Sequence, residues 1–213
     1  MLKNTETEEL IKQARAKVSD LSILKVSTVI YGAMALVGLG VIHFGHESLS
    51  SIFALEPLMP DNARLLLIAG LVAGLLLIMS YFFEDWFASY RELKISITSL
   101  LGPLSVSSTL YLALVSSIGE ELLFRGAIQP YAGLVVTSIL FGFLHLGQDG
   151  KISAWSIWAV IAGLLMGWTY EQTSSLWPAV ISHFIVNTTS ILMIRRSYQN
   201  LQKQLASKSK ATL

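Results

Sequence analysis

The chain has 213 residues, of which 53% are hydrophobic and only 14% are charged. Together with a mean hydropathy of +0.60, this composition is too apolar for a soluble domain of this length and indicates an integral membrane protein. The sequence has no cysteine, which excludes disulfides, thiolate nucleophiles and cysteine metal ligands, and its net charge of +1 gives no indication of a nucleic-acid partner.

The apolar segments, taken in chain order, predict an all-α, polytopic membrane helical bundle. Several of them approach or exceed the roughly 20 residues that a helix needs to cross a bilayer, and none alternates with the period of two typical of a barrel strand. We expect about six transmembrane helices. They correspond to residues 24–45, 63–83, 104–130, 134–147, 153–170 and 176–194, with an amphipathic piece, DWFASYRELKISITSLL, between the second and the third.

The same reading divides the chain into four parts. A polar cytoplasmic helix, which we expect to remain on the mature protein, occupies 1–23, and N-terminal transmembrane helices with the amphipathic connector occupy 24–103. A core domain follows over 104–194, and a basic cytoplasmic tail over 195–213.

The distribution of basic residues predicts the orientation. With a cytoplasmic N-terminus and six crossings, all of the 15 Lys and Arg except Arg64 and Arg125 fall on the cytoplasmic side. The expected topology is therefore N-in and C-in, most simply in the inner membrane of a cell.

The stretch SSIGEELLFRGAIQPY places two glutamates and an arginine in an apolar helix. A charged side chain at the bilayer centre costs roughly 2.5 to 3.5 kcal/mol, so two adjacent carboxylates need an explanation. Glu121 and Arg125 are separated by four residues and can form a structural ion pair. Glu120 lies about 100° further round the helix and has no comparable partner in its own segment, so it is the stronger candidate for chemistry.

Two further polar motifs lie at similar depth. In FGFLH, Phe141 and His145 share a helix face, and a turn near Ala132 and Gly133 would place Glu120 and His145 at one level, each about 18 to 20 Å along its helix. His145 also has a purely structural explanation, because buried histidines are often hydrogen-bonded core residues.

The third motif, SLWPAVISHFIVN, carries His183 and Asn187 on one helix face. An intramembrane asparagine can serve only to join helices. Four polar side chains that converge on one layer from three helices nevertheless indicate a single site better than four separate structural roles do.

Together, EELLFR, FGFLH and HFIVN resemble the EExxxR, FxxxH and HxxxN/D motifs of the CPBP family, which contains CAAX proteases and bacteriocin-processing enzymes. The resemblance covers about residues 104–193 and implies an intramembrane endopeptidase similar to the type II CAAX prenyl proteases. It implies a prenylated protein or other peptide substrate, in contact with membrane lipid.

The resemblance also assigns roles by motif position. Glu120 and His145 would activate a water, His183 and Asn187 would stabilise the oxyanion, and Glu121 and Arg125, with Phe141, would support the site. Metal use is left open by the sequence: either no cofactor is needed, or a divalent metal such as zinc is held by Glu120, His145 and His183.

Two other functions are compatible with the sequence. The family includes non-catalytic members that act as bacteriocin self-immunity proteins or as membrane scaffolds, and polar residues at mid-depth also occur in small transporters. The combination of an acid, two histidines and an asparagine suits hydrolysis better than ion passage.

Overall fold

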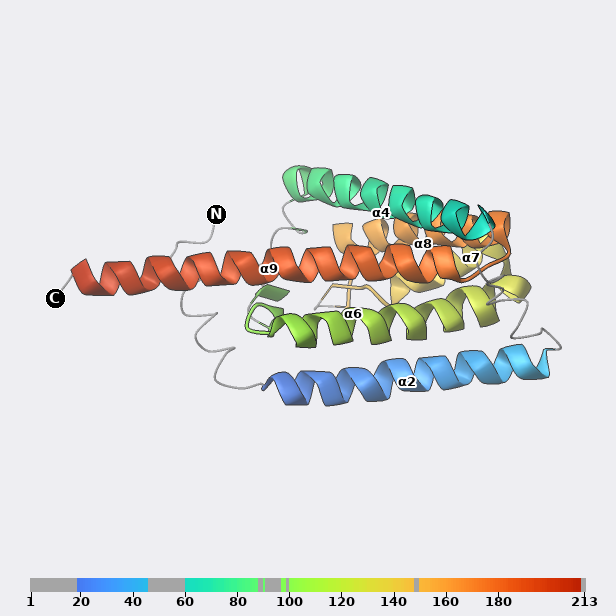
Figure 1. Ribbon diagram of the computed structural model, residues 1–213, viewed down its shortest axis with the longest axis horizontal. Helices are drawn as coiled ribbons and strands as arrows, with labels where there is room; N and C mark the ends of the chain where they lie inside the picture. The colour runs from blue at the N-terminus through green and yellow to red at the C-terminus, as the bar shows by residue number, and fades with distance from the viewer. Residues whose placement is uncertain are drawn as a thin grey trace.

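The computed structural model describes residues 19–45, 60–87, 90, 97–98, 100–147 and 150–211, and these residues form helices without any strand. The predicted polar helix up to residue 18 and most of the amphipathic connector lie outside them. The helices lie side by side in a bundle, from which the longest, α9, extends at one end (Figure 1). They are α2 (Asp20–Phe44), α4 (Pro60–Trp86), α6 (Val106–Glu121), η1 (Leu122–Ile128), α7 (Gln129–Phe143), α8 (Ala154–Thr173) and α9 (Trp177–Ala211).

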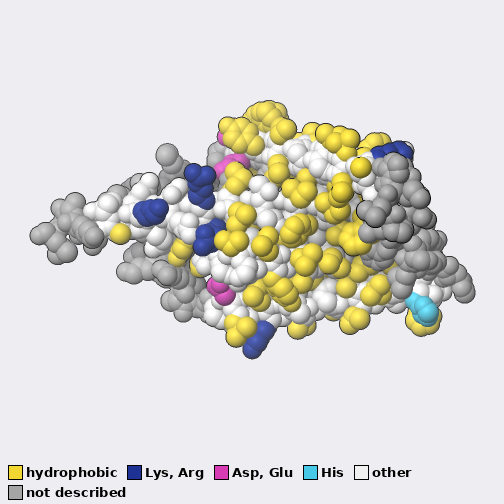
Figure 2. All heavy atoms as spheres, viewed as in Figure 1, with side chains coloured by type: hydrophobic (Ala, Val, Ile, Leu, Met, Phe, Trp, Pro, Cys, Tyr) yellow, Lys and Arg dark blue, Asp and Glu magenta, His cyan; other side chains and the backbone are white. Residues whose placement is uncertain are grey.

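The described residues confirm an all-helical membrane protein but not six crossings. Four helical stretches are long and apolar enough to span a bilayer, namely Asp20–Phe44, Asn62–Trp86, Val106–Phe143 and Trp177–Gln204. Hydrophobic side chains cover the middle of the face in Figure 2, and charged side chains gather towards its ends, as expected for a bundle surrounded by lipid. The N-in, C-in orientation is likewise not confirmed.

The third of these stretches is a hairpin. Gly133 has φ 75° and ψ 166°, a conformation that glycine adopts far more readily than other residues. The rings of Phe124 and Phe141 are 5.1 Å apart between centroids, whereas 17 residues of continuous helix would separate them by about 25 Å. The chain therefore doubles back at Gly133, which confirms the turn predicted there.

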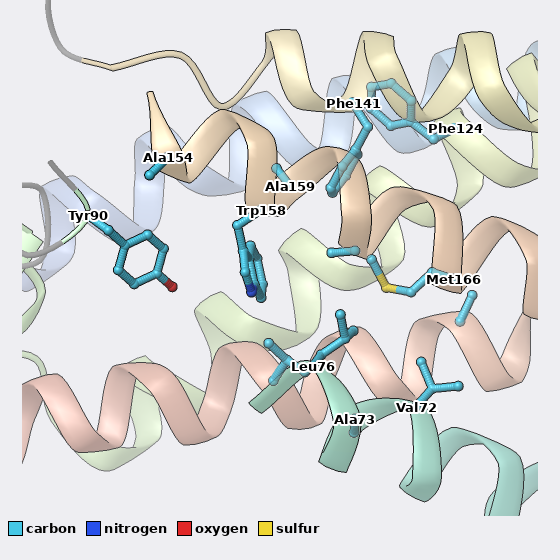
Figure 3. Packing of buried hydrophobic residues seen from close by; sticks show 13 residues of the cluster. Val72, Ala73, Leu76, Tyr90, Phe124, Phe141, Ala154, Trp158, Ala159 and Met166 are labelled. Atoms are coloured by element: carbon cyan, nitrogen blue, oxygen red, sulfur yellow. The ribbon is translucent and has the colours of Figure 1, made fainter. Parts of the chain in front are cut away.

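The main hydrophobic core lies between the hairpin and α4, α8 and α9. Trp158 projects from α8 towards the side on which α4 and α9 lie (Figure 3). Alanines at the contacts allow the helix backbones to approach closely, as is common between membrane helices. These alanines are Ala73, Ala159, Ala162 and Ala179.

The segment that follows the two glutamates is a π-helix. Residues Leu122–Ile128 have this wider winding directly after α6 ends at Glu121. Stretches of π-helix are rare and occur often at functional sites. From this segment Arg125 reaches α8, where it contacts the carbonyl oxygen of Gly163.

Candidate functional site

Glu120 and Glu121 are the last residues of α6, and both are removed from solvent. Glu120 is 6% exposed and Glu121 is fully buried. Buried carboxylates are stable only when they are paired, hydrogen-bonded or protonated. The surroundings of the two side chains therefore decide what each can do.

Glu121 forms the ion pair with Arg125 that the sequence predicted. Arg125 Nη1 donates a hydrogen bond to Glu121 Oε1 at 3.2 Å, and Nε lies 3.2 Å from Oε2. The guanidinium also donates from Nη2 to the carbonyl oxygen of Gly163 on α8 at 3.2 Å, and its Cζ lies 4.7 Å from the centroid of the Phe141 ring. The buried arginine thus joins the hairpin to α8.

His183 of α9 lies between the two glutamates. Its Nδ1 is 2.8 Å from Glu121 Oε1, and its Nε2 is 3.8 Å from Glu120 Oε2. Because an ionised carboxylate can only accept a hydrogen bond, His183 Nδ1 carries the proton in the contact with Glu121. Nε2 of the same ring faces Glu120. Glu121 is therefore not only the partner of Arg125, since it also orients a histidine of the site.

One oxygen of Glu120 has no hydrogen-bond donor among the described residues. Glu120 Oε2 is buried, and His183 Nε2 lies 3.8 Å from it, beyond hydrogen-bond distance. A water in contact with both atoms would satisfy the orphaned oxygen. This arrangement is suited to a carboxylate that binds and deprotonates a water.

His145 lies just beyond the end of α7, with its ring packed on aromatic side chains. Its Nδ1 is 2.8 Å from the carbonyl oxygen of Phe141, so Nδ1 carries the proton and Nε2 retains its lone pair. The imidazole centroid is 4.6 Å from that of Phe141 and 5.6 Å from that of Trp155. Phe141 also contacts His183 at 6.1 Å, so one phenyl ring lies against both histidines.

The hairpin brings the limb that leads to His145 back alongside the limb that follows Glu120. Phe124 and Phe141 contact each other and are almost equally far in sequence from the bend. Glu120 precedes Phe124 by four residues, and His145 follows Phe141 by four residues, so this pair is also almost equally far from the bend. Neighbouring antiparallel segments hold such pairs at the same depth.

Asn187 is the predicted site residue with a partner that was not expected. Its Nδ2 donates to Ser116 Oγ at 3.0 Å, and none of the hydrogen bonds described for it goes to a glutamate. Ser116 precedes Glu120 by one turn of α6, so the contact fixes α9 against α6 beside the carboxylates. In the sequence, the signal for Ser116 is its spacing of four residues from Glu120, which places both on one face of the helix.

A cavity begins next to this site. It has a volume of about 440 Å³, and its mainly apolar lining comes mostly from α4, α8 and α9. Asn187 lines it together with Tyr90, Trp155 and Trp158. An apolar chain could lie in this cavity close to the polar cluster.

The predicted metal ligands do not form a metal site. In the part of the chain that the structure describes, no group of three His, Asp or Glu side chains is arranged to hold an ion. The Nδ1 atoms of both histidines are already engaged, with Phe141 and Glu121. These contacts leave Nε2 of each imidazole as the ring atom that could bind an ion. Glu120, His145 and His183 are nevertheless not gathered around one position, so the label of metalloprotease is not supported.

The fold and these contacts define a class: a helical membrane protein with a carboxylate and histidine cluster buried among its helices. Residues 102–189 match the family model described as type II CAAX prenyl endopeptidase Rce1-like. The chain thus carries an Rce1-like domain over these residues, which confirms there the resemblance that the three motifs indicated.

The curated proteins include a relative from Bacillus subtilis (strain 168). It is called "Uncharacterized protein YpbD" and is 31% identical over 93 residues, which are 43% of this chain and 48% of that protein. The chain therefore matches about half the length of this relative. No solved structure matches the chain.

Proposed function

We propose that the protein is an intramembrane endopeptidase that hydrolyses prenylated CAAX-type or other membrane-associated peptides. The observation that carries this proposal is the orphaned, buried Oε2 of Glu120 opposite His183 Nε2. A water held there, with His145 at the same depth, has a base beside it and no bulk solvent around it.

In the proposed reaction, Glu120 takes a proton from the water while the water oxygen attacks the scissile carbonyl carbon. His145, whose Nε2 is free to accept, orients the same water. The proton then passes from Glu120 to the leaving amine when the C–N bond breaks. The products are a carboxylic acid and an amine, so the water is consumed and the enzyme is regenerated.

The oxyanion would be stabilised from α9. In its imidazolium form, His183 donates Nδ1–H to Glu121 and has a second N–H on the side of Glu120. The Asn187 amide has two N–H groups, one of which is used by Ser116. Donors that are already fixed before the charge develops stabilise the transition state most effectively.

The supporting roles follow from the same contacts. Glu121 and Arg125 hold His183 and α8 in place, and Phe141 packs against both imidazoles and against Phe124. The apolar cavity beside Asn187 would receive the lipid-like or apolar part of the substrate.

We also propose six crossings with both ends in the cytoplasm of a cell and the protein in its inner membrane. The start of α2 and the end of α9 lie at the same end of the bundle (Figure 1). The hairpin at Gly133 turns one long apolar stretch into two limbs. An even number of crossings puts both ends of the chain on one side of the membrane, and the basic residues in the last part of α9 favour the cytoplasmic side.

The test is peptide cleavage by the purified full chain in detergent, followed by mass spectrometry of the products. A prenylated peptide, its unprenylated counterpart and an unrelated membrane-embedded peptide are compared, with and without a chelator. Cleavage that is lost in Glu120→Ala and in His145→Ala, while both variants remain folded, supports the proposal. Activity retained in both variants would show that the chemistry lies elsewhere, and no cleavage by the unmodified chain would favour an immunity or scaffold role.

A further inference from the structure

A tyrosine outside the matched segment contacts the proposed catalytic carboxylate. Tyr31 belongs to α2, more than 70 residues before the start of the Rce1-like match at residue 102. Its side chain reaches the Glu120 side chain, where the phenolic O–H group is the donor and the carboxylate the acceptor. Nothing in the apolar segment around Tyr31 distinguishes it by sequence.

The position of Tyr31 is fixed by close backbone contact between α2 and α6. A Cβ on Gly119 would lie 2.5 Å from the Tyr31 carbonyl oxygen and 3.0 Å from its Cβ, so only glycine fits at that place. Gly119 directly precedes Glu120. The α6 backbone beside Glu120 is thus in direct contact with the backbone of Tyr31.

Two more contacts hold the helices in the same register. A Cβ on Gly38 of α2 would lie 2.8 Å from the backbone of Leu122, and a Cβ on Gly126 would lie 2.8 Å from Ile42 Cδ1. Gly38 and Ile42 are the buried residues of α2, most of which is exposed. These two buried residues of the outer helix thus lie against η1, the segment that directly follows the glutamates.

The contact with Tyr31 leaves one oxygen of Glu120 available. Oε2 has no donor among the described residues and lies on the side of His183. A carboxylate with one donor on α2 has less rotational freedom than one without. We propose that Tyr31 is a positioning residue, which holds the Glu120 carboxylate so that its unbonded oxygen faces His183 and the reacting water.

This inference rests on the proposed function for its kinetic consequence, but the contact itself can be tested without activity. Tyr31→Phe removes the hydroxyl and keeps the ring. Tyr111→Phe is the matched control, because Tyr111 Oη also joins α6 to α2, through Thr28 Oγ1 at 2.7 Å. Tyr111 lies nine residues before Glu120, about 13 Å along the helix.

The first readout is labelling of the full chain by dicyclohexylcarbodiimide, which reacts with protonated carboxyl groups in apolar surroundings, with the modified residue identified by mass spectrometry. Loss of a donor to the carboxylate makes its protonation easier, so Tyr31→Phe should label at Glu120 roughly tenfold faster than the unmodified chain. Tyr111→Phe should label at the unmodified rate. Equal rates in both variants would overturn the inference.

The second readout is the split between kcat and KM for whichever peptide the unmodified chain cleaves. Tyr31→Phe should lower kcat roughly 10- to 100-fold and leave KM within about twofold, because the lost bond orients the base and does not bind substrate. An unchanged kcat would overturn the positioning role even if labelling rises. If labelling rises but the unmodified chain cleaves nothing, the contact with Glu120 is supported and the protease proposal fails.

Discussion

Glu120 and Glu121 are neighbours in the sequence but differ in their surroundings. Glu121 neutralises a buried arginine and orients His183, whereas Glu120 keeps one oxygen without a donor. Glu121→Gln leaves the Arg125 charge uncompensated, and breaking a buried pair in this way costs about 3 to 5 kcal/mol. We expect a clearly lower Tm in detergent for Glu121→Gln and for Arg125→Ala, measured by circular dichroism.

Glu120→Gln supplies the comparison. The amide has nearly the shape of the carboxylate and no buried cation depends on Glu120 alone, so folding should be largely preserved while hydrolysis is abolished. Equal losses of thermal stability in Glu120→Gln and Glu121→Gln would contradict the division of roles.

Ser116 tests whether the orientation of Asn187 matters. Ser116→Ala removes the acceptor of the Asn187 amide, and loss of one such hydrogen bond should lower kcat by up to about tenfold with little change in KM. Ser117→Ala is the control, since the Ser117 hydroxyl donates to the Ala113 carbonyl oxygen within its own helix. If both variants have the same kcat, Ser116 has no part in the reaction.

At the residue scale, the sequence predicted what depends on spacing within one helix. The Glu121–Arg125 pair and the turn at Gly133 follow from local pattern, and both are present. The Arg125 contact with the Gly163 carbonyl could not be predicted, because a backbone acceptor on another helix leaves no mark on residue type. The same holds for Tyr31, which is one aromatic residue in an apolar helix.

Among the elements, α2 depends most on small residues for its position. Gly38→Ala would bring a Cβ to 2.8 Å from the Leu122 backbone, which cannot move aside as a side chain can. We expect a loss of about 1 to 3 kcal/mol in the free energy of unfolding, measured by denaturant titration in detergent.

Gly40→Ala is the control on the same helix. Nothing lies within 4 Å of a Cβ on Gly40, and replacing a helical glycine by alanine typically stabilises by about 0.5 to 1 kcal/mol. A Gly40→Ala variant as unstable as Gly38→Ala would show that α2 is not seated on η1 through Gly38.

The sequence predicted the helical elements better than their relations. Apolar length was sufficient to locate α2, α4 and α9, because a bilayer-spanning helix must be long and apolar. The π-helix of η1 was not predicted, since it depends on packing against neighbouring helices and its residues have no distinctive pattern.

At the scale of the whole molecule, the absence of cysteine makes the topology directly measurable. Single cysteines introduced as Ser22→Cys near the start of α2, Ala63→Cys near the start of α4 and Ser207→Cys near the end of α9 fall at exposed positions. The proposed orientation places the first and third in the cytoplasm and the second on the opposite side.

A membrane-impermeant maleimide applied to intact bacterial cells should therefore label Ala63→Cys alone, and the other two should react only in inside-out vesicles. The unsubstituted chain gives no background because it has no thiol. Labelling of Ser22→Cys and Ser207→Cys from opposite sides would require an odd number of crossings. In that case at least one limb of the hairpin or α8 does not span the bilayer, and the depth shared by Glu120 and His145 would have to be explained by a re-entrant segment.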